Sequence, residues 1–309
     1  MTTTIKKWTS DNIPSLRGKT VIVTGTGGIG FETILMLASA GAKVIMAGRN
    51  ATKGAKSISD IKSRFPEVDI EFEQLDLADL SSIQKFSERM LKQLDQLDIL
   101  VNNVAVMNPP HRQLTKDGFE LQFGTNYLGP FALTGQLLPL LKSSSYARVV
   151  TVSSIANRQG KIDFDNLQSD KSYIPMDAYA QSKLADLMFA FELQRKSDSK
   201  GWGISSFAAH PGVSRTELIP NGAGRNSPAG IIRRVFGPVL FQPASHGAWP
   251  SLYCASMTDA KSGTYYGPRS LGETRGYPTF ARVPDAAKDL NVAAKLWEVS
   301  EQLTHVTFK

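Results

Sequence analysis

Tyr179 and Lys183 are the residues of this sequence whose types and spacing most directly suggest chemistry. They stand four positions apart in a segment whose apolar residues recur at helical spacing, so their side chains share one face of a predicted helix. A free tyrosine titrates near pH ~10 and is a weak acid–base catalyst at neutral pH. A cation one turn away favours the phenolate and lowers the tyrosine pKa. The pair can therefore move a proton, although the same spacing also occurs by chance.

Two further polar residues are expected near this pair. Ser154 follows a strand-like run at 147–153, where its hydroxyl would point into a crevice, and Asn126 lies in the preceding helical stretch. Ser154 could instead be a turn or cap hydroxyl, and Asn126 a helix cap or a core amide. Taken together, the four residues supply an acid, a charge and two groups that position a substrate. We predict that they form one catalytic group.

A glycine cluster, TGTGGIG at 24–30, follows the first predicted strand and opens the first predicted helix. Glycines let backbone amides approach a pyrophosphate closely, and the helix N-terminus adds partial positive charge. On its own, a glycine cluster could be an ordinary turn. Its place between a strand and a helix favours a dinucleotide site, with contacts from Gly25, Thr26, Gly28, Ile29 and Gly30.

The residues that follow the second and third predicted strands bear on which dinucleotide is bound. An enzyme that uses NAD usually has an acidic residue after the second strand, whereas this chain has Arg49, with Lys53 nearby. Arg49 can bind a 2′-phosphate through charge-assisted hydrogen bonds, which favours NADP(H) over NAD(H); alternatively, its side chain is solvated. Asp76 could accept a hydrogen bond from the adenine amino group, or it could cap the helix that begins near Leu80.

Short apolar runs alternate with helical stretches along the chain. Continuous apolar strands separated by helices indicate a parallel sheet covered on both faces. No linker divides the chain, so residues 1–309 are predicted to form one doubly wound α/β domain, a Rossmann fold with ligands beyond the carboxyl ends of its strands. We expect seven strands, at 19–24, 42–48, 70–75, 97–102, 147–153, 204–210 and 262–267, and helices that include 31–40, 51–64 and 80–94.

Composition narrows the class of protein further. The single cysteine, Cys254, excludes an internal disulfide, and the four histidines are widely separated, so no metal site is expected. The net charge of +7 comes from dispersed Lys and Arg residues, so nucleic-acid binding is not expected either. We find no signal peptide and no apolar run long enough to span a membrane. A cytoplasmic protein that acts on a small molecule, away from membranes, is expected.

The ordered motifs resemble those of the short-chain dehydrogenase/reductase family, in particular its branch of retinol-dehydrogenase-like and bacterial oxidoreductases. The resemblance covers nearly the whole chain and implies an NADP(H)-dependent alcohol dehydrogenase or carbonyl reductase. Family members commonly form dimers or tetramers, which leaves a homodimer or homotetramer open. The stretches that carry the resemblance are VIVTG, AGRN, LDLADLSS, DILVNN, DGFELQFGTNYLGPFALT, RVVTVSS, KIDFDNLQSDKSYIPMDAYAQSKLA, AHPGVSRTEL and GTYYGP.

The resemblance also implies a role for each matching residue. Tyr179 would be the acid–base, and Lys183 would bind the nicotinamide ribose and lower the tyrosine pKa. Ser154 would hold the substrate oxygen, and Asn126 would position the lysine through a water. The implied cofactor contacts, in addition to Lys183 and the glycine loop, are Asp76, Leu77, Asn103 beside the cofactor on the fourth strand, Pro211 and Gly212 over the nicotinamide, and Thr216 at its carboxamide.

Two motifs depart from the family pattern. The loop TGTGGIG is one residue shorter than the family's TGxxxGxG, at a position near the adenosine ribose. The family's NNAG reads Asn102-Asn103-Val104-Ala105 here, which places a methyl group where glycine normally lets the cofactor approach. Both departures concern cofactor affinity and the preference between NADP and NAD. They slightly favour the main alternative function, a non-catalytic dinucleotide-binding sensor or scaffold, whereas the complete set of Asn126, Ser154, Tyr179 and Lys183 opposes it, because a binding protein does not need all four. An epimerase or dehydratase would rest on analogy of fold alone.

Residues 213–243 form a long segment, rich in apolar side chains and glycine, after the sixth predicted strand. A segment in this place can close over the nicotinamide end of the crevice and exclude water. It would then favour a lipophilic aldehyde, ketone or alcohol as substrate. Alternatively, its apolar residues pack on the domain or form a subunit interface, or one of its arginines turns inward to bind an acid group.

Overall fold

An eight-stranded sheet runs through the part of the chain that the structure, a computed structural model, describes: residues 7–214 and 242–309. The strands lie side by side in the order β3-β2-β1-β4-β5-β6-β7-β8. All neighbouring pairs are parallel except β7 with β8, which is antiparallel. The strands are β1 (Thr20–Thr24), β2 (Lys43–Gly48), β3 (Ile70–Gln74), β4 (Ile99–Asn102), β5 (Arg148–Val152), β6 (Ser205–Ala209), β7 (Thr264–Ser270) and β8 (Arg275–Phe280).

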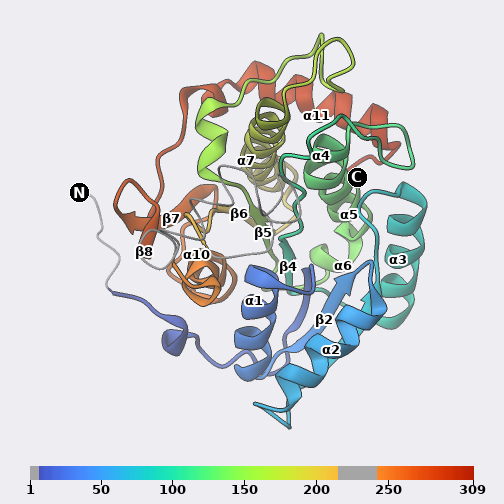
Figure 1. The fold of residues 1–309 in the computed structure, drawn as a ribbon. Helices are drawn as coiled ribbons and strands as arrows, with labels where there is room; N and C mark the ends of the chain where they lie inside the picture. Colours follow the sequence, from blue (N-terminus) through green and yellow to red (C-terminus); the bar gives the residue numbers. More distant parts are fainter. Residues whose placement is uncertain (1–6, 215–241) are drawn as a thin grey trace.

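Helices cover both faces of this sheet, as Figure 1 shows. One face is covered by α1 (Gly28–Ser39), α2 (Ala51–Lys62) and α10 (Ala244–Ser256). The other face is covered by α3 (Leu80–Gln93), α4 (Leu121–Phe123), α5 (Gly129–Gln136), α6 (Leu138–Lys142), α7 (Pro175–Lys200) and α11 (Leu290–Thr304). Shorter helical turns are η1 (Ser10–Asn12), the π-helix η2 (Gly124–Leu128), η3 (Ile155–Gln159) and η4 (Asp285–Lys288).

The strands send alternate side chains into two cores. In β1, Ile22 packs into the core that includes α3, α5 and α7, whereas Val21 and Val23 pack into the core that includes α1 and α10. A strand that is buried on both faces must be apolar at every position, which is why these segments read as continuous apolar runs. The doubly wound α/β fold expected from the sequence is therefore confirmed.

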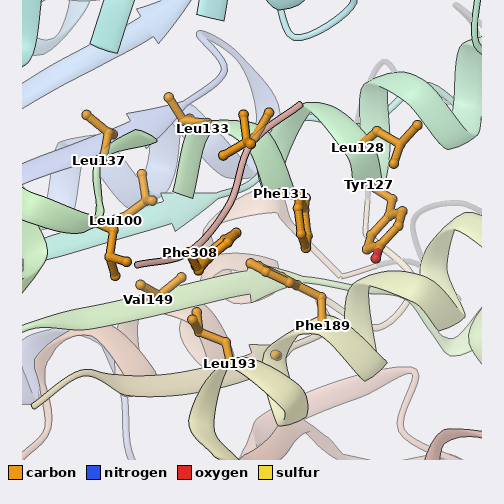
Figure 2. Packing of buried hydrophobic residues seen from close by; sticks show 14 of the residues in the cluster. Leu100, Tyr127, Leu128, Phe131, Leu133, Leu137, Val149, Phe189, Leu193 and Phe308 are labelled. Atoms are coloured by element: carbon orange, nitrogen blue, oxygen red, sulfur yellow. The ribbon is translucent and has the colours of Figure 1, made fainter. Parts of the chain in front are cut away.

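An aromatic cluster fixes α7 against the helices beside it, and Figure 2 shows its centre. Phe189 of α7 lies 5.6 Å from Phe131 of α5 and 5.7 Å from Trp297 of α11, measured between ring centroids. Phe308, in the tail after α11, lies 5.0 Å from Phe131. Ring pairs at these distances add to the free energy of burying apolar area. The helix that carries Tyr179 and Lys183 is therefore held on its core side by α5, α11 and the C-terminal tail.

The structure differs from the expected elements in a few places. The antiparallel strand β8 was missed because its sequence, RGYPTF, contains a glycine and a proline, and its residues are mostly half-buried. The first helix begins at Gly28, not at Phe31. Most of the segment 213–243, and with it the interpretation of that segment as a lid, lies outside the described residues. Among the described helices, none is both long and apolar enough to cross a membrane.

Candidate active site

The glycine loop is anchored to the end of the neighbouring strand β4 by Asn103. The Asn103 backbone N–H donates to the Thr24 hydroxyl at 2.8 Å, and its side-chain amide donates to the Thr24 carbonyl at 2.9 Å. A Cβ atom on Gly30 would lie 2.6 Å from Asn103 Nδ2, and one on Gly25 would lie 3.0 Å from it. Gly25 also has a φ of 102°, which few other residues adopt. The glycines therefore make room for the side chain that holds the loop in place.

A cavity of about 260 Å³ opens beside this loop, at the carboxyl ends of β1 to β4. Arg49 and Lys53 give its β2 end two positive charges, and α1 begins at Gly28 with its N-terminus at the loop. This arrangement fits the phosphate groups of a dinucleotide, which bind to cations and to helix N-termini. The predicted contact residues on its wall are Gly25, Thr26, Arg49, Asp76 and Leu77, together with Val104 and Ala105 from the altered NNAG motif.

The other predicted cofactor residues near the glycine loop do not line the cavity. Gly28, Ile29 and Gly30 form the first turn of α1, and Asn103 lies behind the loop instead of on the cavity wall. The suggestion that Asp76 caps the next helix is wrong, because Asp79 accepts the hydrogen bonds of the first backbone N–H groups of α3. Asp76 accepts from the backbone N–H of Ala78 at 3.0 Å and lines the cavity.

Three of the four predicted catalytic residues meet at the carboxyl end of β5. Tyr179 and Lys183 are both buried on α7, and the Lys183 ammonium lies 6.0 Å from the centre of the Tyr179 ring. Ser154 lies two residues after the end of β5, and its interaction with the Tyr179 side chain lowers the pKa of that tyrosine. The Ser154 hydroxyl also accepts from the Ala156 backbone at 3.2 Å and starts η3, so the alternative reading of Ser154 as a cap holds as well.

Burial dominates the acidity of Tyr179. Desolvation raises its pKa, while the Lys183 charge and the hydrogen bond with Ser154 lower it. The lysine therefore acts in the expected direction, but the net shift is upward, opposite to what the sequence alone suggested. The phenolate is penalised because the side chain is only 5% exposed, and one cation does not fully compensate for the lost hydration.

The Lys183 ammonium forms a buried ion pair that the sequence reading missed. Its Nζ donates to Asp186 Oδ2 at 2.8 Å and to the Val152 carbonyl at 3.0 Å. Both charged side chains are almost completely buried. The spacing of Lys183 and Asp186 could have predicted this ion pair, because residues three apart on a helix share a face.

Asn126 lies in the π-helix η2 and holds the segment after β4 against α7. Its side chain accepts from the Val106 N–H at 2.7 Å and donates to the Val106 carbonyl and to the Ser182 hydroxyl, each at 2.9 Å. These bonds do not reach Lys183 directly. The Asn126 side chain is therefore a buried core amide, which is one of the alternatives that the sequence left open. Its partner Ser182 is the residue before Lys183, the lysine that Asn126 was expected to position.

The loop at Pro211 and Gly212 is clamped by the hairpin between β7 and β8. Gly212 has a φ of 64°, and a Cβ there would collide with the Thr274 carbonyl. Glu273 of the hairpin lies 3.0 Å from the buried His210 ring and also pairs with Arg158. Burial lowers the pKa of His210, and the Glu273 carboxylate opposes that shift. Thr216, the remaining predicted contact, lies outside the described residues.

The chain is similar to known proteins over most of its length. The profile of the short chain dehydrogenase family matches residues 19–222. Mouse retinol dehydrogenase 13 is 41% identical over 94% of this chain and 84% of its own length, and human polyprenol dehydrogenase is 40% identical over 76% and 71%. The crystal structure of a Mycobacterium paratuberculosis protein superposes with a TM-score of 0.81 at 38% identity, covering 98% of this chain and 100% of that one.

The chain belongs to the short-chain dehydrogenase/reductase family, whose members are NAD(P)-dependent oxidoreductases. Within the family it lies in the retinol-dehydrogenase-like branch, as the motifs of its sequence indicated.

The contact between Gly30 and Asn103 can be tested with one methyl group. We expect Gly30→Ala to displace Asn103 from Thr24, lower the melting temperature and weaken dinucleotide binding on the order of tenfold, or about 1.4 kcal/mol. Gly27→Ala is the matched control, because a Cβ there meets nothing within 4 Å and the backbone φ is −142°. Thermal unfolding and fluorescence titration with NADPH measure both effects. Equal losses in the two variants would contradict the assigned role of Asn103.

Proposed function

We propose that this protein is an NADP(H)-dependent oxidoreductase that moves a hydride between nicotinamide and a carbonyl or alcohol substrate, with Tyr179 as the acid–base. The observation that carries the proposal is the buried Tyr179 hydroxyl, whose pKa both Ser154 and the Lys183 charge one helical turn away lower. This group lies at the same edge of the sheet as the cavity beside the glycine loop, and a dinucleotide in a Rossmann fold crosses that edge.

In the proposed reaction each residue has a separate task. Bound NADPH would supply the hydride for carbonyl reduction. The Tyr179 hydroxyl would donate its proton to the carbonyl oxygen, and the Ser154 hydroxyl would hold that oxygen in place. Lys183 has three N–H donors, and within residues 7–214 and 242–309 Val152 and Asp186 accept two of them, which leaves one for a ribose hydroxyl. In the reverse direction the Tyr179 phenolate would accept the proton of the alcohol.

The preference for NADP(H) is supported by the charges at the β2 end of the cavity. Arg49 and Lys53 both line the wall there, and the 2′-phosphate of NADP is the feature that two cations would recognise.

A lipophilic substrate is supported by the names of two relatives. Retinol and polyprenol, from which the mouse and human enzymes take their names, are hydrocarbon-rich alcohols. The apolar residues between 213 and 243 would supply a matching pocket wall, although most of this segment lies outside the described residues.

We further propose that the enzyme works in the cytoplasm on small molecules, without membrane or nucleic acid partners. Cell fractionation tests its location.

The role of Tyr179 is tested by Tyr179→Phe, which removes the transferable proton and keeps the ring. Turnover should fall by ~10²–10⁴, as is usual when general acid–base catalysis is lost, while NADPH binding persists. The assay is NADPH oxidation against a panel of ketones and aldehydes. Tyr146→Phe is the control, because the Tyr146 hydroxyl bonds to the Ser256 carbonyl at the opposite end of β5 from Ser154. Near-normal turnover in Tyr179→Phe would refute the assignment, and dinucleotide binding by the parent without any turnover would favour the sensor or scaffold.

The preference for NADP(H) is tested by Arg49→Ala. A charge-assisted contact contributes about 1.5–3 kcal/mol, so the NADPH dissociation constant should rise by about one to two decades. The NADH dissociation constant should hardly change, because NADH lacks the 2′-phosphate. Arg64→Ala, which removes the same charge from an exposed position just after α2, is the control. Equal weakening of both cofactors would show that Arg49 does not recognise the phosphate.

The chemical class of the substrate is tested with carbonyl compounds of increasing alkyl length and matched carboxylated analogues. Each additional buried methylene should improve catalytic efficiency by up to ~0.8 kcal/mol, or about fourfold. A flat response together with a preference for the carboxylates would reject the apolar pocket and point to arginines between 213 and 243.

A further inference from the structure

The carboxylate of Asp186 occupies a position that needs an explanation beyond packing. Its side chain is 1% exposed, and one of its oxygens, Oδ1, has no hydrogen-bond partner among the described residues, although the other binds Lys183. A buried carboxylate with an unsatisfied oxygen costs free energy, and a buried ion pair is often no more stable than an apolar pair of similar volume. Its contribution is therefore better sought in what it does to Lys183 than in the stability of the fold.

The geometry around Lys183 shows two effects of this carboxylate. Together with the Val152 carbonyl, Asp186 fixes two of the three directions in which the ammonium can donate. Burial raises the pKa of Asp186 to about 7, although the Lys183 charge opposes this shift. Above that pH the carboxylate places a negative charge beside the positive charge that acts on Tyr179. Because all three side chains are buried on one helix, water screens these charges only weakly.

We propose that Asp186 is a positioning residue for the reaction: its carboxylate holds the Lys183 ammonium at the end of β5 and offsets part of its charge at the Tyr179 hydroxyl. This inference rests on the proposed function, in which Tyr179 exchanges a proton with the substrate. Asp186 would keep Tyr179 protonated to higher pH and so favour its role as the acid in carbonyl reduction.

The direction of this effect follows from the charges that act on Tyr179. Burial raises the pKa of the Tyr179 hydroxyl, Lys183 and Ser154 lower it, and the Asp186 carboxylate raises it again. Without the Asp186 charge, the Lys183 ammonium would act on the phenol uncompensated. Tyr179 would then lose its proton at a lower pH.

Other charged or titratable groups on the elements around this part of α7 have partners elsewhere. Among the described residues, Arg158 of η3 pairs with Glu273, and Glu120 accepts the first backbone N–H bonds of α4. The Tyr127 hydroxyl of η2 lies 2.7 Å from Ser300 of α11, and burial together with the Asp186 charge raises its pKa. The buried His210, which follows β6, faces Glu273. Lys183 and Asp186 are thus the charges that oppose one another at Tyr179.

The test is the pH dependence of turnover in Asp186→Asn, which keeps the shape and a hydrogen-bond acceptor but removes the charge. Alcohol oxidation needs the phenolate, so the pH at which its rate rises should fall by on the order of one pH unit. Carbonyl reduction needs the phenol, so its decline with pH should move in the same direction. Asp198→Asn is the matched control, because it removes an equal charge from an exposed position on α7 and should leave both profiles unchanged.

A readout that does not need turnover separates this inference from the proposed function. The Tyr179 ring can be titrated by NMR in protein labelled with ¹³Cζ-tyrosine and saturated with NADP⁺, with Tyr179→Phe identifying the signal. If the Tyr179 pKa falls in Asp186→Asn and the protein turns over no substrate, the result would support the electrostatic effect of Asp186 on Tyr179 and reject the proposed function.

An active enzyme in which both the pH profile and the NMR titration stay unchanged, or move upward, would overturn the role of Asp186 alone. If Asp186→Asn does not fold, Asp186→Ser removes the same charge with a smaller side chain and carries the same expectation. Loss of the fold in both variants would assign Asp186 to stability and would also overturn the inference.

Discussion

Strands β1 through β7 run parallel, so the chain must return across a face of the sheet between each of them and the next. The returning segments bury both faces, and all the carboxyl ends of these strands lie at one edge. The glycine loop, Arg49, Asp76, Asn103, Ser154 and the loop at Pro211 all follow strands at that edge. The parallel sheet alone therefore brings together segments that are distant in the sequence. Among the described residues, a major contribution from elsewhere comes from α7, which brings Tyr179 and Lys183 to the end of β5.

Placing acid–base groups inside this fold sets burial against charge. A phenol that is shielded from water is a weaker acid, and a neighbouring ammonium makes it a stronger one. The ammonium is itself buried, so it requires partners, which are the Val152 carbonyl and Asp186. Each group thus changes the ionisation of the next. A similar balance holds at the clamp on the neighbouring loop, where burial favours neutral His210 and Glu273 favours the charged form.

Much of the fold could be predicted because it depends on patterns along the chain. Apolar runs of strand length, separated by helical spacing, indicated the parallel sheet, and the seven strands predicted in this way are present with ends shifted by up to three residues. The eighth strand has no such pattern, since a half-buried edge strand that contains glycine and proline does not need one. The π-helix around Asn126 was expected only as a helical stretch, because its wider i→i+5 hydrogen bonding leaves no signature in the order of residue types.

The candidate site, like the fold, has features that the sequence predicted and features that only the tertiary structure decided. The sequence by itself determined the family, the positions of the motifs and the shared face of Tyr179 and Lys183, because helical periodicity and strand-end motifs are local properties of the chain. Only the tertiary structure decided that Asp79 and not Asp76 caps α3, that Asn103 supports the glycine loop, and that Glu273 meets His210 from 63 residues away. It also decided the net direction of the Tyr179 pKa shift. Desolvation depends on everything that packs around a group, and no spacing between neighbouring residues along the chain contains that information.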